Sequence, residues 1–468
     1  MIRNGKKKAI SCALVAAMSV GLAACGTTSY DFKVSYDGIK TGDVSSKVSV
    51  HDPSILKADG EYYIFGSHMS AAKSSDLLNW EKVADGYSKK NPVYGQIYDV
   101  ADEAFAYSGS KNSLIKTDDK QVHVWAPDVI YNETTGLYYM YYCTTSTWNA
   151  SNLCYGTSTT PEGPYKWQGA LIYSGFNRKT ISGTDVLDYV DEDYAYKNYI
   201  KGAQYNYEDY PNAIDPTVFY DADGRMWMVY GSWSGGIFLL EIDKTTGLVI
   251  HPEADKANNV DPYYGKRLLG GGHISIEGPY IMYDETSGYY YLFVSYGALT
   301  SNGGYQVRVF RSKTVDGEYV DMNGKYPEKS AQHQNFGLKL TGNYKLPSLE
   351  KAYMATGHNS AFVDDDGRMY LVYHTRFNDN GEGHSPRVHQ MLVNEDGWPC
   401  ELPYQTQGET VNKDGYDADD IIGRYYVINQ GTAIDSKIAN PVILYLEKNG
   451  KVKGEKSEGT WECKDGSY

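Results

Sequence analysis

One short pattern occurs five times between residues 51 and 373 of this 468-residue chain. Each copy opens with a polar or acidic residue, often followed by Pro, and continues into an apolar stretch. A turn that contains Gly, in three copies as Asp-Gly, then leads back into a second apolar stretch that is often rich in Tyr. Consecutive opening residues are 62 to 87 positions apart, and they are Asp52, Asp128, Asp215, Glu277 and His358.

These repeated hairpins predict an all-β chain. Gly and Asp tolerate the positive φ angles of tight hairpin turns, and the 48 Gly and 46 Tyr residues agree with many short strands. The strands are too apolar for a sheet with one wet face, so both faces should be buried. One repeat suffices for a four-stranded sheet, and five sheets around an axis form a five-bladed β-propeller. A jelly roll or sandwich would not account for five equivalent hairpins.

The charge of the chain restricts its partners. The formal net charge is −15, and removal of a leader that holds four basic residues and no acid would make it −15 − 4 = −19. A phosphate backbone would be repelled by such a surface, so the sequence predicts no binding to nucleic acid. A neutral polymer such as a glycan is compatible with this charge.

Residues 1–24 are typical of a secretion signal, since a basic stretch precedes an apolar run of about 16 residues, which is short for a membrane span. The run ends in Leu-Ala-Ala-Cys-Gly at residues 22–26 and resembles a bacterial lipobox. We therefore expect export, lipidation at Cys25, and a polar tether over residues 25–47, at the cell surface or outside the cell. An ordinary cleaved signal with a chance Cys is the alternative.

Four further cysteines follow the leader: Cys143, Cys154, Cys400 and Cys463. Their spacing fits no zinc motif. Export permits disulfides, so Cys143 and Cys154 either pair across a hairpin or remain buried thiols.

The predicted ring would bring the five opening residues together. In a propeller the innermost strands line a central channel, and residues that open equivalent strands meet at one mouth. Carboxyl groups gathered around one axis are unfavourable, because like charges and partial burial raise their pKa values. Such a gathering indicates a functional site rather than a stabilising device.

Two carboxyl groups on opposite sides of a sugar are the minimum for hydrolysis of a glycosidic bond. One must be protonated to donate to the leaving oxygen, and the other must be ionised to activate water. A third acid can raise the pKa of the proton donor by repulsion. The sequence has no HExxH zinc motif, P-loop or dinucleotide fingerprint that would favour other chemistry.

The motifs around these acids resemble glycoside hydrolase family 43, whose members are inverting five-bladed propellers. HDPSI with Asp52, AIDPT with Asp215 and IEGPY with Glu277 look like the catalytic triad of that family. The segments WAPD, SYG, GHNS and YHTRF also occur at the expected places in the chain order, and the resemblance covers roughly residues 48–400. RVHQM and NEDGWP, further along, look most like the two-domain extracellular endo-α-1,5-L-arabinanases.

The resemblance implies a role for each acid. Asp52 would be the general base that activates water, Glu277 the general acid, and Asp215 the residue that tunes and orients Glu277. Asp128 is not in the family triad and is either structural or a binding residue. His358 would hold a calcium ion whose other ligands are mostly water; a neutral His hydrogen-bonded in the channel is the alternative.

Sugar binding needs aromatic faces and polar groups. Trp125, beside the second repeat, is a candidate for stacking on a sugar. Other candidates for the lining of the cleft are Asn212, Ser232, Trp233 and Ser234. Arg376 could reach a substrate hydroxyl. Each of these residues could instead belong to the core or to a loop.

The chain is expected to form a propeller over residues 48–403 and a small β-barrel-like domain over 404–468, with strands near 424–428 and 441–446. About 65 residues is lean for an independent core, so this domain is either truncated or dependent on packing against the propeller. The resemblance implies an endo-arabinanase that acts on arabinan or arabinoxylan side chains. We further expect a monomer that touches the membrane only through its lipid. Alternatives are an exo-acting α-L-arabinofuranosidase, a β-xylosidase, or a non-catalytic glycan-binding surface lipoprotein.

Overall fold

The computed structural model describes residues 29–39, 46–118, 121–147, 149–327, 332–412 and 414–464. The predicted signal segment, the lipidation site Cys25 and parts of the tether lie outside these residues. Within them, no helix is both long and apolar enough to cross a membrane.

Five antiparallel sheets follow one another along the chain, and in four of them the strands lie in sequence order. The first sheet holds β1 (Ser54–Ala58), β2 (Glu61–Gly66), β3 (Ser70–Ser74) and β4 (Glu81–Ala84). The second holds β5 (Val124–Asn132), β6 (Leu137–Thr145), β7 (Ser151–Ser158) and β8 (Lys166–Tyr173). The third has the order β11 (Thr217–Tyr220), β12 (Met226–Tyr230), β13 (Ile237–Ile242), β16 (Gly265–Leu269) and β15 (Val260–Asp261), with β14 (Val249–Ile250) also paired to β13. The fourth holds β17 (Ile276–Asp284), β18 (Tyr289–Tyr296), β19 (Gln306–Ser312) and β20 (Leu338–Thr341), and the fifth β21 (Tyr353–Val363), β22 (Met369–Phe377), β23 (Ser385–Val393) and β24 (Pro399–Glu401).

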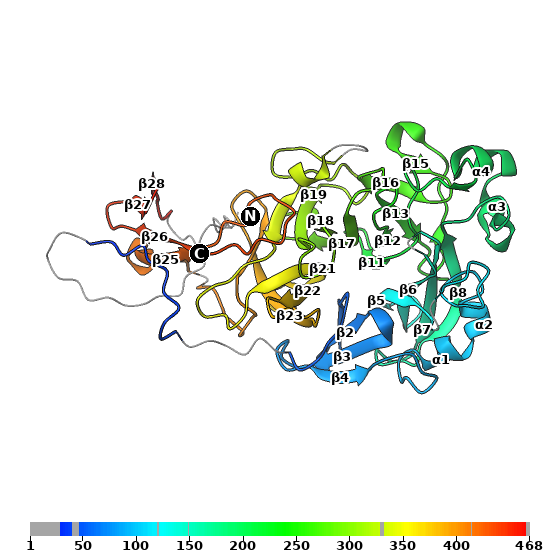
Figure 1. Ribbon diagram of the computed structural model, residues 1–468, viewed down its shortest axis with the longest axis horizontal. Coiled ribbons are helices and arrows are strands. Elements are labelled where there is room, and N and C mark those ends of the chain that lie inside the picture. Colours follow the sequence, from blue (N-terminus) through cyan, green and yellow to red (C-terminus); the bar gives the residue numbers. More distant parts are fainter. Residues whose placement is uncertain are drawn as a thin grey trace, which may run out of the picture.

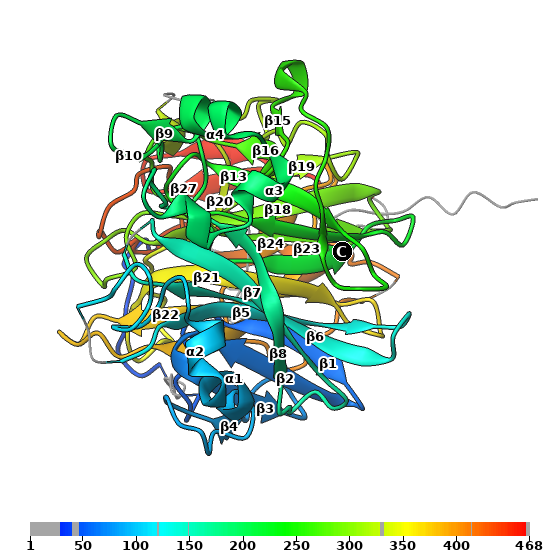
Figure 2. The same ribbon diagram turned by 90° about the vertical axis from the view of Figure 1, so that its right-hand side faces the viewer.

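Short helices lie in the connections. They are α1 (Gly95–Asp99), α2 (Ala101–Ala104), α3 (Val186–Tyr189), α4 (Glu192–Asn198) and the 3-10 turns η1 (Ser67–Met69), η2 (Ile181–Gly183), η3 (Lys256–Asn258) and η4 (His333–Asn335). A two-stranded ribbon, β9 (Ile200–Lys201) with β10 (Gln204–Tyr205), follows α4. Figure 2 shows α1 and α2 beside β8, at the outer edge of the second sheet.

The five sheets form a closed ring. The first strands β1, β5, β11, β17 and β21 contact one another in that order, and β21 also contacts β1. In Figure 1 the colours accordingly pass around the molecule, from blue through cyan and green to yellow. The prediction of an all-β chain built from hairpin repeats is confirmed.

Apolar side chains fill the space between each pair of neighbouring sheets. One buried cluster joins the first sheet to the second through Phe65 and Met140, and another joins the second to the third through Tyr141 and Val218. Two more clusters join the third sheet to the fourth and the fourth to the fifth. A fifth cluster, with Ile64 and Val372, joins the first sheet to the last. Burial on both faces explains why the strand sequences are apolar throughout.

The sheet geometry also determines the state of two cysteines. Cys143 pairs in register with Leu153, and Cys154 with Tyr142, so the two thiols lie on opposite faces of the second sheet. Cys143 belongs to the cluster toward the third sheet and Cys154 to the cluster toward the first. Both are free, buried thiols.

The C-terminal part forms a separate four-stranded antiparallel sheet. It begins after α5 (Ala418–Ile421) and holds β25 (Gly423–Val427), β26 (Val442–Leu446), β27 (Lys451–Gly454) and β28 (Glu458–Thr460). The two strands expected there are therefore present as β25 and β26. This sheet lies at one end of the molecule in Figure 1.

The end of β25 and the segment between β25 and β26 pack against the ring. Tyr344 bridges to Ala439, and an apolar cluster with Leu346, Tyr353 and Phe377 receives Tyr426. Of the two alternatives for the small domain, truncation and dependence on its larger neighbour, this packing is what the second would require.

Asp128 joins three of the innermost strands and has a structural role. Its side chain is buried on β5. One carboxyl oxygen accepts a hydrogen bond from Ser54 of β1, and the other accepts one from the backbone N–H of Val218 of β11 at 2.6 Å. Burial raises the pKa of this carboxyl to about 7. Of the two roles that the sequence left open for Asp128, structural residue or binding residue, these contacts support the structural one.

We expect an Asp128→Asn variant to be as stable as the wild type near pH 3, below the ordinary pKa of 3.8, and more stable near pH 9. Because the folded-state pKa lies above the usual value, the contribution of Asp128 to stability is complete at low pH and is lost as the pH rises through 7. The amide can still accept from Val218 and donate to Ser54. Asp128→Ala should lower the free energy of unfolding by about 2–3 kcal/mol near pH 3, and this deficit relative to the wild type should shrink as the pH rises, because alanine does not titrate. Denaturant unfolding measures these free energies. An Asn variant with a free energy of unfolding as low as that of the Ala variant near pH 9 would contradict the prediction.

Candidate active site

The five repeats share a backbone conformation at the start of their first strands. One residue in each has a φ between +40° and +54°, and these residues are Asp52, Ala126, Asp215, Gly278 and His358. A left-handed conformation costs a residue other than Gly on the order of 1 kcal/mol or more. Strain of this kind is typical of functional sites.

This conformation corrects the alignment of the repeats. Asp52 and Asp215 occupy the left-handed position, but Asp128 lies two residues after it and Glu277 one residue before it. Irregular pairing lies next to both acids, since the register shifts between Trp125 and Asp128 and between Glu277 and Tyr280. The side chain of Asp128 is bound between neighbouring strands. Glu277, by contrast, directly precedes the left-handed residue Gly278.

Asp52 is surrounded by donors. Ser67 Oγ donates to Asp52 Oδ2 at 2.5 Å, and the Nδ1 atoms of His51 and His358 lie 3.2 and 3.1 Å from its carboxyl oxygens. The backbone N–H of Asp52 donates to His374 Nδ1 at 3.2 Å. Burial alone would raise the pKa of Asp52, but the attraction of His358, His51 and His374 and the bond from Ser67 outweigh it and lower the pKa. Asp52 is thus ionised.

Asp215 has the opposite tendency. Its side chain is buried, and Oδ2 accepts a hydrogen bond from the backbone N–H of Gly278 at 3.2 Å. Burial, together with the charges of Glu277 and Asp52, raises the pKa of Asp215 to about 7, although His358 opposes this effect.

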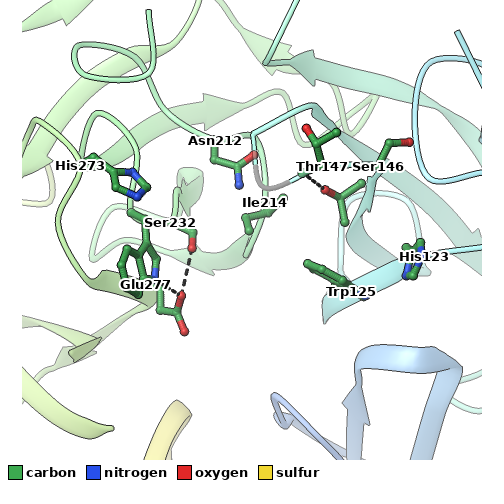
Figure 3. A pocket seen from close by; sticks show the side chains of 11 residues that line it. His123, Trp125, Ser146, Thr147, Asn212, Ile214, Ser232, His273 and Glu277 are labelled. Carbon is green, nitrogen blue, oxygen red and sulfur yellow. Dashed lines mark hydrogen bonds between the residues drawn. The ribbon is translucent and has the colours of Figure 1, made fainter. Parts of the chain in front are cut away.

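Glu277 accepts three hydrogen bonds from side chains. Trp233 Nε1 and Ser232 Oγ donate to Oε2 at 2.6 and 3.2 Å, as Figure 3 shows, and Tyr305 donates to Oε1 at 2.7 Å. Burial, with a smaller contribution from Asp52, raises the pKa of Glu277, while Tyr305, His358 and Trp233 act against it. A raised pKa is what a proton donor needs.

His358 connects the three acids. Its ring lies against Gly278, where a Cβ atom would come within 3.1 Å of it. Burial would lower the pKa of His358, but Asp52, Asp215 and Glu277 together raise it. Three acids from the first, third and fourth repeats and the imidazole of His358 from the fifth therefore form a single electrostatic cluster.

A pocket of about 470 Å³ opens beside Glu277. Four of the residues predicted to line the cleft are found in its wall: Trp125, Asn212, Ser232 and Trp233 (Figure 3). The wall contains both aromatic faces and polar groups, which is the combination that sugars require.

Two of the candidates lie elsewhere. Ser234 is fully buried and is not part of the pocket wall, and its backbone forms a bridge to His273. Arg376 is also buried, and its guanidinium donates to the carbonyl oxygens of Leu299 and Glu382. Its side chain thus fixes two loops.

The sequence analysis missed part of the site. His123, Thr145, Ser146, Thr147, Ile214 and His273 also line the pocket. Most of them belong to connections between strands, which do not follow the repeat. Tyr305 precedes β19 and Ser67 begins η1, so neither is marked by a motif. His51 and His374 do lie in the motifs HDPSI and YHTRF, but the motifs alone did not reveal their contacts with Asp52.

Candidate metal ligands converge on Asp52. Among the described residues, His51, Asp52 and His374 can offer ligand atoms that all lie within 4.8 Å of one another. His51 Nε2 and His374 Nε2 are buried and have no hydrogen-bond partner. His358 Nδ1 faces Asp52 Oδ1, which leaves one ring nitrogen of His358 for another ligand.

The chain was compared with known proteins. It matches the family described as "Glycosyl hydrolases family 43" over residues 44–209 and 191–399, and a "C-terminal lipocalin-like domain" over residues 403–468. It is 40% identical to the extracellular endo-α-(1→5)-L-arabinanase of Thermotoga petrophila over 429 residues, which cover 89% of this chain and 83% of that protein. It is 37% identical to the extracellular endo-α-(1→5)-L-arabinanase 2 of Bacillus subtilis, with the same two coverages.

A solved structure agrees with these matches. The crystal structure of the endo-1,5-α-L-arabinanase from Thermotoga petrophila RKU-1 in complex with TRIS superposes with a TM-score of 0.76 and 37% identity, covering 94% of this chain and 88% of that one. From the match over most of its length and from these relatives, it follows that the chain is a member of glycosyl hydrolases family 43.

Proposed function

We propose that this protein is an extracellular endo-arabinanase that cleaves internal α-1,5-L-arabinofuranosidic bonds of arabinan with inversion. The observation that carries the proposal is its 40% and 37% identity, over 89% of the chain, to two relatives with that activity in their names. The pairing of an ionised carboxylate with a proton-donating carboxyl supports it.

The proposed reaction assigns one role to each acid. Asp52 takes a proton from a water molecule as the water attacks the anomeric carbon, and Glu277 gives its proton to the leaving glycosidic oxygen while the bond to that carbon breaks. Asp215, buried and bonded to the backbone next to Glu277, tunes and orients the acid. The lowered pKa of Asp52 and the raised pKa of Glu277 support this division.

We also infer that the five sheets are the blades of a five-bladed β-propeller. The support is the closed sequence of contacts between first strands, together with the five apolar clusters between neighbouring sheets. The central axis then passes the cluster of acids. The propeller would end near residue 403 and the small domain would follow, in agreement with family matches that end at 399 and begin at 403.

We assign substrate contacts to the wall of the pocket. Trp125 offers an apolar face on which a sugar ring can stack, and Asn212, Ser232 and Trp233 surround the approach to Glu277. Ser232 and Trp233 also hold the acid, so they serve both binding and orientation.

The signal and lipobox pattern support export and lipid anchoring at Cys25, and we propose that this lipid is the only contact with the membrane. Two relatives are described as extracellular. Because the ring closes within one chain, we propose that the protein acts as a monomer.

The products released from linear arabinan test the proposed activity. Internal cleavage should yield a mixture of arabino-oligosaccharides early in the reaction and a rapid fall in polymer length, with little free arabinose. An exo-acting relative, 27% identical to this chain over 369 residues, provides the alternative outcome. Release of monosaccharide alone would reject internal cleavage, and no hydrolysis of arabinan, xylan or aryl glycosides would support a binding protein instead.

Substitution of the two main acids tests their roles. Asp52→Asn and Glu277→Ala should each lower kcat on arabinan by about 10²- to 10⁴-fold, as expected for loss of a general base or acid. In the wild type, activity should persist to low pH, because the pKa of Asp52 is lowered, and should fall on the alkaline side as Glu277 loses its proton. The acid Asp128, which lies outside the cluster, offers a matched control as Asp128→Asn. Near wild-type rates for Glu277→Ala would remove the acid assignment.

We propose that a hydrated calcium ion binds near His358. The donor set fits such an ion, because one imidazole nitrogen remains for it and the ionised carboxylate of Asp52 makes the surroundings negative, while water would supply most of the oxygen ligands that calcium prefers. When bound, the ion would supply positive charge that favours the ionised form of Asp52.

Removal of metal tests this site. A chelator should lower both the activity and the melting temperature of the wild type, and added calcium should restore them. His358→Gln should show a smaller response of melting temperature to calcium. If the chelator changes neither quantity, His358 is a residue of the hydrogen-bonded channel and not a metal ligand.

A further inference from the structure

Tyr305 holds the proposed acid from the side opposite Trp233. It directly precedes β19, its side chain is buried, and its hydroxyl donates to Glu277 Oε1 at 2.7 Å. Trp233 occupies the other carboxyl oxygen at 2.6 Å. Glu277 is therefore held at both oxygens, which fixes the rotation of its carboxyl group.

The ring of Tyr305 is itself held in place. It lies nearly parallel to the imidazole of His374, at a centroid distance of 5.8 Å and an interplanar angle of 17°. On another side it touches Gly357, where a Cβ atom would come within 2.3 Å of the Tyr305 ring. Only Gly fits at this position without displacing the ring. His374 also accepts a hydrogen bond from the backbone N–H of Asp52. Tyr305 therefore packs against a residue that contacts the base, while its own hydroxyl binds the acid.

Tyr305 can serve both forms of the acid. The indole N–H of Trp233 can only donate, so it favours the carboxylate. A tyrosine hydroxyl can donate to the carboxylate or turn and accept from the carboxylic acid. Hydrogen bonds to a charged oxygen in a partly buried site are among the strong ones.

We propose that Tyr305 is a positioning residue, which orients Glu277 and stabilises the carboxylate that remains after its proton has passed to the leaving oxygen. This inference rests on the proposed role of Glu277 as general acid. Tyr305 neither gains nor loses a proton overall. The proton moves from Glu277 to the glycosidic oxygen, and solvent returns one to Glu277 after the products have left.

The main test is Tyr305→Phe. On linear arabinan, kcat should fall about 10- to 100-fold, as expected for loss of a hydrogen bond to a charged group, while KM stays nearly constant. The alkaline limb of the pH profile should move to higher pH, since the carboxylate has lost a donor. A residue that only fills space would lower activity or melting temperature without moving this limb. An unmoved limb would overturn the proposal.

Gly357→Ala provides a second variant that keeps the hydroxyl but displaces the ring. It should lower kcat and move the alkaline limb in the same direction as Tyr305→Phe. If both act through the bond to Glu277, the double variant should be no slower than the slower single variant. Additive losses would show that Gly357 acts on something other than this bond.

A substrate with a better leaving group distinguishes the proposed role of Tyr305 from the proposed role of Glu277 as general acid. An aryl arabino-oligosaccharide with an acidic phenol needs little proton donation, so the defects of Tyr305→Phe and Glu277→Ala should both shrink on it. If Glu277→Ala shows this pattern but Tyr305→Phe lowers kcat by the same factor on both substrates, the Tyr305 proposal fails and the acid assignment stands. If Glu277→Ala is equally slow on both, the acid assignment itself fails.

Discussion

Closure of the ring is the constraint on which the rest of the structure depends. Asp52 lies in the first repeat and His358 in the last, yet their side chains are 3.1 Å apart. They meet because an apolar cluster with Ile64 and Val372 seals the first sheet to the fifth. Without this seal, the base would lose its contact with His358, the imidazole that contributes most to lowering the pKa of Asp52, and His358 would be left among two acids rather than three.

The electrostatics of the site follow from this closure. Three carboxyl groups that face one axis cannot all be ionised, since each charge raises the pKa of the others. The hydrogen-bond donors and imidazoles around each carboxyl group decide in which direction its pKa moves. Asp52 has the histidines and Ser67 and is ionised, whereas Asp215 has one backbone N–H and a pKa of about 7. Glu277 lies between these extremes, because burial raises its pKa and three side-chain donors limit the rise.

Much of this arrangement was predictable from the sequence. Hairpin turns and strands that are apolar on both faces specify repeated sheets, and the repeat identified Asp52, Asp215 and His358 as residues near one axis. The pattern misplaced Asp128 because it recorded an acid near a strand start and not the backbone conformation. Ala126, which has the left-handed φ in that repeat, carries no such chemical signal.

The pocket wall was harder to predict for a different reason. Thr145, Thr147 and His273 lie at strand ends or in connections, where length and sequence vary without the constraint of a two-residue period. Tyr305 was invisible for a related reason, since its position depends on a close approach to Gly357 from another sheet. Contacts of this kind depend on tertiary geometry, and a single sequence does not encode them in any local pattern.

The C-terminal part contributes to the same region from outside the ring. Gln306 donates to the carbonyl oxygen of Ala433 at 3.0 Å, and the buried Arg308 donates to that of Thr432. Gly304 approaches Asp435 so closely that a Cβ atom would lie 2.7 Å from its backbone. The residues on both sides of Tyr305 therefore contact the segment between β25 and β26, Gly304 by close approach and Gln306 by a hydrogen bond. Because a buried Arg or Gln is unfavourable without its acceptors, the beginning of β19 depends on the small domain for one acceptor of Gln306 and one of Arg308, which joins the two parts at the acid side of the site.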